Sequence, residues 1–271
     1  MTMTETPTDG RTAPAPEQRL GVVTRAEWHR LLRKGGVPVP VLVAATAGLA
    51  GGILTMLVMK SLAPEPTKVM TTTSVETGAF VCALVLSIAA VFAVGRDHTG
   101  QLGLALSLTP KRERLFMARL LSWAALTATS TAFVTIVIAG LGLVLSRGNF
   151  AGSGLVGVAA TVVGSTSMVL VAVALAHLVG RAFGAVLLLI GVNLLLPLAV
   201  FAVGAMIPEQ AAGTIDSLVN VTPTPLFMQA ISATTVEELG PGRLLLGQLG
   251  LAVWAVVLGG LALTVFRRRN L

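Results

Sequence analysis

Six apolar stretches constrain the fold of this chain most, because each holds roughly 20 residues or more without an Asp, Glu, Lys or Arg. A helix of that length crosses a hydrocarbon core about 30 Å thick, and in lipid only helices satisfy their own backbone groups within one segment. The sequence therefore predicts an all-α integral membrane protein with six transmembrane helices. These are expected at Val37–Met59, Thr77–Gly95, Leu120–Leu145, Leu155–Val179, Gly184–Ile207 and Leu244–Phe266.

The basic residues predict the orientation of these spans. With the N-terminus in the cytoplasm, 15 of the 19 Lys and Arg residues lie in inner segments, whereas Asp and Glu divide evenly between the two sides. This asymmetry follows the positive-inside rule and predicts a multi-pass plasma-membrane protein with both termini cytoplasmic. The net charge of +7 does not indicate nucleic acid, because the cations are dispersed among the span flanks. Trp123 is expected at the inner interface.

The segment before the first span divides into two parts. Residues 1–19, rich in Thr, Pro, Glu and Ala, are expected to form a disordered cytoplasmic tail. Residues 20–36 have helical periodicity and predict an amphipathic helix in the membrane interface, the alternative being a solvated basic flank. Its apolar face would carry Leu20, Thr24, Trp28, Leu31 and Leu32, and its polar face Arg25, His29, Arg30, Arg33 and Lys34. Residues 37–271 then form the six-span domain.

The connection 96–119, between the second and third spans, is too long for a simple turn. It has charged flanks around a short apolar segment, Gly103–Leu108, and Thr109 and Pro110 are suited to begin a helix as N-cap and first residue. An apolar segment held below the membrane is poorly matched to water unless another protein covers it. We therefore predict a short cytoplasmic coupling helix that docks against a partner.

This connection also resembles a known family. The run Arg96-Asp97-His98-Thr99-Gly100-Gln101-Leu102, followed by Leu106-Ser107-Leu108-Thr109-Pro110-Lys111-Arg112, is similar to a stretch in ABC transporter permeases of the type-two export family. The chain departs from that pattern in carrying Gln101 for the usual Thr, in the closer spacing of Asp97 to the Gly, and in Arg119 for the usual Lys. Six spans, an interfacial N-terminal helix and a long outer loop agree with the resemblance over nearly the whole chain.

The resemblance implies a permease subunit whose motor is a separate chain. Two permeases, as a homodimer or heterodimer, would pair with two ATP-binding-cassette ATPase subunits that hold ATP and Mg²⁺. This chain itself has no Gly-x-x-x-x-Gly-Lys-Ser/Thr loop for ATP, and we expect no cofactor in it. The residues expected to couple to the ATPase are Asp97, Gly100, Leu102, Leu104, Leu106, Pro110 and Arg112.

Two other classes of membrane protein remain as alternatives. A secondary transporter or channel-like protein would need no ATPase, but ion coupling normally requires ionisable side chains at membrane depth, and the spans offer only His177. A membrane enzyme would need a catalytic constellation. The adjacent pairs Asp97-His98 and Glu237-Glu238 make none, and the single Cys82 supports neither a disulfide nor a metal cluster. We therefore expect a transport subunit that is not an enzyme.

Three further features concern packing and the transport path. Pro197 removes a backbone hydrogen bond and frees a carbonyl near Asn193, so these two residues predict a kink and a candidate substrate contact. Gly48 and Gly52 predict a close helix–helix seam. The outer loop 208–243 is expected to hold two short helices, Ala211–Val219 and Leu226–Val236, and the resemblance implies that they cap the outer mouth.

Overall fold

The structure is a computed structural model that describes residues 19–33, 38–62, 68–100, 111–145, 154–204, 217, 219–232 and 241–268. Within these ranges the chain is helical and contains no strand. The elements are α1 (Leu20–Arg33), α2 (Pro38–Leu62), α3 (Lys68–Gly100), α5 (Arg112–Leu145), α6 (Gly154–Val179), α7 (Ala182–Ile190), η1 (Gly191–Leu195), α8 (Leu196–Gly204), α10 (Pro223–Ile231) and α12 (Pro241–Arg268).

Six of the described helices are long and apolar enough to cross a membrane, which confirms the predicted fold class at this level. Helix α3 begins nine residues before the predicted span, and α5 begins eight residues before its own. The apolar stretches thus mark the middle of each helix, while polar first and last turns extend it. The fifth candidate span is not one regular helix, since α7, η1 and α8 follow one another without a break.

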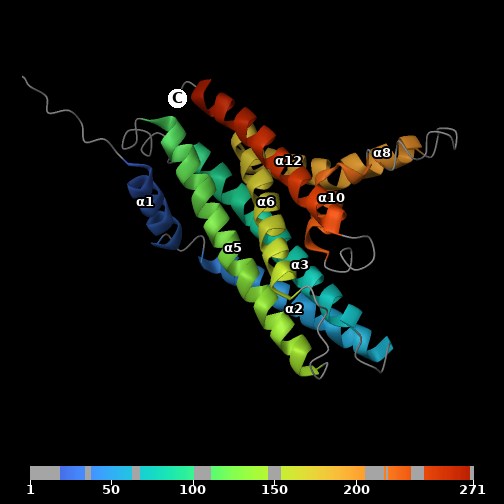
Figure 1. The fold of residues 1–271 in the computed structure, drawn as a ribbon. Helices are drawn as coiled ribbons and strands as arrows, with labels where there is room; N and C mark the ends of the chain where they lie inside the picture. The colour runs from blue at the N-terminus through green and yellow to red at the C-terminus, as the bar shows by residue number, and fades with distance from the viewer. Residues whose placement is uncertain are drawn as a thin grey trace, which may run out of the picture.

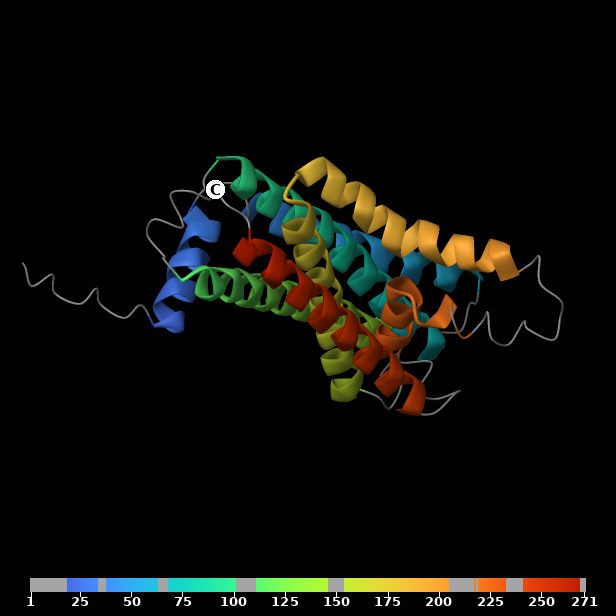
Figure 2. The ribbon, with the colours of Figure 1, turned by 90° about the horizontal axis from the view of Figure 1, so that it is seen from above.

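Helices α3 and α6 form the centre of the bundle. In each of them 56% of the most apolar window is buried inside the protein, against 11% in the fifth span and 17% in α12. Figure 1 shows α5, α6 and α12 crossing close together and α8 extending away from them, and Figure 2 shows the same separation from above. Helices α7 and α8 therefore present most of their apolar surface outward, as lipid-facing or partner-facing helices do.

Helices α2, α3 and α5 meet at a seam of glycines. A Cβ atom at Gly48 would lie 2.8 Å from the carbonyl oxygen of Gly78, and one at Gly52 would lie 2.9 Å from that of Ser74. No side chain fits at either position, so the backbones approach to a distance that only glycine allows. This confirms the predicted packing role of Gly48 and Gly52.

The segment between the fifth and sixth spans contains the short helix α10, which differs from the expected one. It begins at Pro223 instead of Leu226, because Pro223 and Pro225 fall in the first turn, where a helix needs no backbone N–H donor. It ends at Ile231, since Ser232 is extended, with φ −77° and ψ 105°. The predicted helix Ala211–Val219 falls almost entirely on residues outside the described ranges.

Candidate functional site

Helix α1 packs across the first turns of α5, at the end of the bundle where α3 ends and α5 begins, hereafter the α1 end (Figures 1 and 2). Val23, Glu27 and Leu31 form its buried face, with at most 7% of each residue exposed. Trp28 is partly buried against the same core, whereas Leu20 and Leu32 remain 39% and 44% exposed. Part of the predicted apolar face thus packs against the other helices, and the rest lies on the surface of the protein.

An ion network joins α1, α3 and α5 at this end. Both guanidinium Nη atoms of Arg30 donate to the carboxylate of Asp97, at 2.8 and 2.6 Å. The Nε atom of Arg30 also donates to Glu27 at 2.8 Å, and Nη2 of Arg119 lies 3.3 Å from Asp97. The network therefore holds the end of α3 between α1 and the first turns of α5.

Burial strengthens these contacts. The side chains of Arg119, Glu27 and Asp97 keep only 3%, 7% and 15% of their exposure. Burial alone would lower the pKa of Arg30, but the hydrogen bonds and charges of Asp97 and Glu27 offset it and raise that pKa above its ordinary value. Arg30 therefore stays charged at every physiological pH, and a bidentate Arg–carboxylate pair fixes orientation as well as distance.

The end of α12 reaches the same region. Arg267 forms an ion pair with Glu113 at 2.7 Å, and Nη1 of Arg112 donates to the carbonyl oxygen of Arg267 at 3.2 Å. The two side chains of the ion pair are about half exposed, so the pair contributes at most about 1 kcal/mol. It nevertheless holds the end of α12 beside the start of α5, and the Arg119–Asp97 pair brings the end of α3 to the same end of the bundle.

The predicted coupling residues are only partly within the described ranges. Asp97 lies in the ion network, Gly100 is the last residue of α3, and Arg112 is the first residue of α5. Leu102, Leu104, Leu106 and Pro110 lie outside the described residues, so the coupling helix stays a prediction. Sequence reasoning missed the roles of Glu27 and Arg30; their spacing of three residues was a local signal, but the 67-residue separation of Arg30 from Asp97 hid the long-range pair.

A second polar site lies where the fifth span changes from α to π geometry. The backbone N–H of Leu196 donates to the carbonyl of Gly191, five residues back, and η1 carries Asn193. Pro197 supplies no N–H to Asn193, four residues earlier, and the Thr224 hydroxyl of α10 donates to that carbonyl at 2.7 Å instead. The Nδ2 group of Asn193 donates to the Leu189 carbonyl at 2.8 Å. Substrate contact at Asn193 and Pro197 stays a prediction.

Helix α10 is held between α6 and α12 by side chains of α12. Nε2 of Gln248 donates to the carbonyls of Ala160 and Ala230, at 2.7 and 2.8 Å, and Nε1 of Trp254 donates to that of Val221 at 2.9 Å. A Cβ atom at Gly247 would lie 2.6 Å from the backbone nitrogen of Ala230. Hydrogen bonds to α12 and to the fifth span, together with packing against α6, therefore anchor this short helix inside the bundle.

Of the remaining candidates, His177 has a packing role in the structure. His177 is fully buried, with its ring edge-on to Phe116 at 5.0 Å and to Phe266 at 5.5 Å, so it packs three helices at the α1 end. Across the ranges given above, no group of three His, Cys, Asp or Glu residues could hold a metal ion.

Comparisons with protein-family models and with curated proteins find no match for this chain.

Proposed function

We propose that this chain is the transmembrane permease subunit of an ATP-driven ABC-type exporter in a plasma membrane. It would form the translocation pathway as a homodimer or heterodimer, with ATP and Mg²⁺ held by a separate ATPase subunit. The α1 end would face the cytoplasm, in agreement with the excess of Lys and Arg in the segments on that side. The resemblance around Asp97 supplies the family.

The Arg30–Asp97–Arg119 network is the observation that carries this proposal. It lies at the end of α3 and on the first turns of α5, the two helices on either side of the connection 101–110. A motor that moves this connection needs stiff contacts to transmit the motion. The hydrogen-bonded ion pair between α1 and α3 and the buried ion pair between α3 and α5 supply such contacts, because displacing one helix separates paired charges at low dielectric.

The test is the association of the chain with its motor. The double variant Leu104→Asp/Leu106→Asp, co-expressed with the ATP-binding-cassette ATPase that we expect to co-purify with the unsubstituted chain, should insert normally and fail to co-purify with that ATPase. The reason is that a contact buried against the motor would have to desolvate two carboxylates, at a cost of several kcal/mol.

A matched control makes the same change at the opposite end of the spans. Leu62→Asp/Val144→Asp places two carboxylates at helix ends where the side chains are 76% and 78% exposed, and association should survive. Full association of the Leu104/Leu106 variant would show that the connection is a passive loop and would overturn the proposal.

A further inference from the structure

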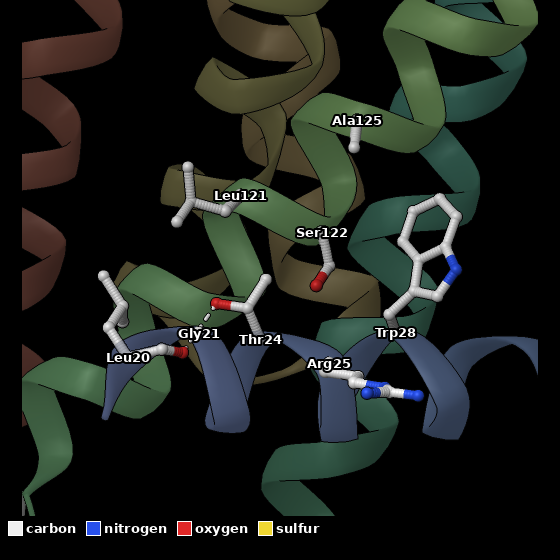
Figure 3. Close-up of a pocket in the computed structure, with 8 residues that line it drawn as sticks. All are labelled: Leu20, Gly21, Thr24, Arg25, Trp28, Leu121, Ser122 and Ala125. Atoms are coloured by element: carbon white, nitrogen blue, oxygen red, sulfur yellow. Dashed lines mark hydrogen bonds between the residues drawn. The ribbon is translucent and has the colours of Figure 1, made fainter. Parts of the chain in front are cut away.

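The angle between α1 and α5 contains an open groove of about 440 Å³. It is lined by Leu20, Gly21, Thr24, Arg25, Trp28, Leu121, Ser122 and Ala125 (Figure 3). Most of this lining is apolar, but it includes one exposed cation and one buried hydroxyl. An amphipathic ligand with an anionic group suits such a lining.

The Ser122 hydroxyl is the first sign of a ligand. The residue is 1% exposed, and its Oγ has no hydrogen-bond partner among the residues that the structure describes. Figure 3 shows this side chain pointing from α5 toward α1, into the groove. The neighbouring Thr24 hydroxyl donates to the Leu20 carbonyl at 3.0 Å and forms no hydrogen bond with Ser122. A buried hydroxyl without a partner costs free energy, which a ligand acceptor would recover.

The charge at the groove is the second sign. Arg25 is exposed and, unlike Arg30, has no carboxylate partner in the described part of the chain. The acidic residue of α1, Glu27, is already engaged by Arg30. A cation at the mouth of an apolar groove in the membrane interface is the arrangement that binds an anionic lipid headgroup.

We propose that this groove binds an anionic phospholipid of the inner leaflet. Its phosphate pairs with Arg25, an ester carbonyl accepts from Ser122, and an acyl chain lies along Leu121 and Ala125. These two positions are exposed and one helical turn apart, so they form an apolar strip that runs along α5 from α1. The inference rests on the membrane placement of α1 and is independent of the ATPase.

Brominated lipids give a direct test, because a brominated acyl chain quenches tryptophan fluorescence only at close contact. The full chain is reconstituted without any ATPase in phosphatidylcholine vesicles that contain brominated phosphatidylglycerol or brominated phosphatidylcholine. The signal of Trp28 is the part that Trp28→Phe removes. Phosphatidylglycerol should quench it at about one-fifth of the mole fraction that phosphatidylcholine requires, since one surface Arg near anionic lipid changes binding by about fivefold.

Two pairs of variants separate a site from a diffuse surface charge. Arg25→Gln should abolish the preference for phosphatidylglycerol, whereas Arg181→Gln, which removes an exposed cation that does not line the groove, should keep it. Ala125→Phe should reduce quenching by both lipids because it fills the acyl strip. Val253→Phe, at a 60% exposed position of α12 that does not line the groove, should not.

Several outcomes would overturn the proposal. Equal quenching by the two lipids in the unsubstituted protein excludes a headgroup site. Equal effects of Arg25→Gln and Arg181→Gln indicate only the general surface potential, and unchanged quenching in Ala125→Phe excludes the acyl strip. Absence of quenching by either lipid means that protein, such as a second copy of the chain, covers the groove. None of these readouts depends on transport or on ATP.

Discussion

At the residue scale, the carboxylate of Asp97 is shared between two cations, which come from two different helices. It accepts hydrogen bonds from Arg30 of α1 and lies 3.3 Å from Arg119 of α5. The Arg119 side chain is only 3% exposed. A buried charge that loses its only close counter-charge costs more than one whose neighbour is merely weakened. Arg30, with 23% of its side chain exposed, keeps partial access to water and retains Glu27. The three members of the network are therefore unequal.

We predict that Asp97→Asn destabilises the protein by about 3 kcal/mol, because it removes the carboxylate that forms an ion pair with the buried Arg119. Arg30→Gln should cost less, about 2 kcal/mol, since Asp97 and the buried Glu27 both keep the charge of Arg119 nearby. Thermal unfolding in detergent, followed by circular dichroism, should give the larger loss of melting temperature for Asp97→Asn. The two variants combined should cost less than the sum of the single variants. A larger loss for Arg30→Gln would contradict this hierarchy.

At the scale of elements, the fifth span and α10 form one unit. The π-helical turn η1 and Pro197 leave the Asn193 carbonyl without its usual helical donor, and Thr224 provides that donor from another helix. A single-turn π segment inside an α-helix often marks a functional site. Side-chain hydrogen bonds connect α10 to Asn193 in the fifth span and to Gln248 of α12, so movement of α10 must alter its contacts with both elements.

The bond from Thr224 can be tested by suppression. Thr224→Val removes the donor to the Asn193 carbonyl and should cost about 1–2 kcal/mol, whereas Thr224→Ser keeps the hydroxyl and should be nearly neutral. Adding Pro197→Ala restores a backbone N–H four residues from Asn193 and should recover most of the loss. Melting temperatures of the three variants and the double variant decide this. If Pro197→Ala does not restore the stability that Thr224→Val loses, Thr224 does not stabilise the protein by replacing the N–H that Pro197 lacks.

The elements that the sequence predicted are those determined by local composition. A long apolar stretch must become a helix in lipid, so the six spans could be read directly. Contacts between segments far apart in the chain leave no local pattern in the sequence. Sequence reasoning therefore missed Asp97 as the partner of Arg30, and it missed that Val23 and Glu27 lie on the buried face of α1. Trp123 was expected at the interface but is 2% exposed in the core, because an aromatic residue at a span end fits either environment.

At the scale of the whole molecule, the α1 end gathers the ends of α3 and α12 and the start of α5 (Figure 1). Ion pairs and aromatic contacts are concentrated there, through Asp97, Glu113 and His177. The segment proposed to meet the motor thus adjoins the part of the described bundle where these ion pairs lie. At the other end, side chains of α10 and α12 donate hydrogen bonds to backbone carbonyls and hold α10 in place.

The orientation of the molecule is testable by cysteine labelling. Cysteines introduced at Lys68 and Glu237 should react with a membrane-impermeant thiol reagent added to intact cells. Cysteines at Arg112 and Arg268 should react only after the membrane is opened. The native Cys82 is fully buried and gives little background. The reverse labelling pattern would place the α1 end outside the cell and remove the basis for a cytoplasmic motor.

The subunit composition of the complex tests the central claim most directly. The chain is tagged at its C-terminus, purified from its native membranes in mild detergent, and examined by native mass spectrometry. We predict two six-span subunits, at least one of them this 27.8 kDa chain, together with two ATP-binding-cassette ATPase subunits that bind ATP and Mg²⁺. Recovery of this chain as a stable assembly that contains no ATP-binding-cassette ATPase would contradict the account and favour a transporter or channel that needs no ATP.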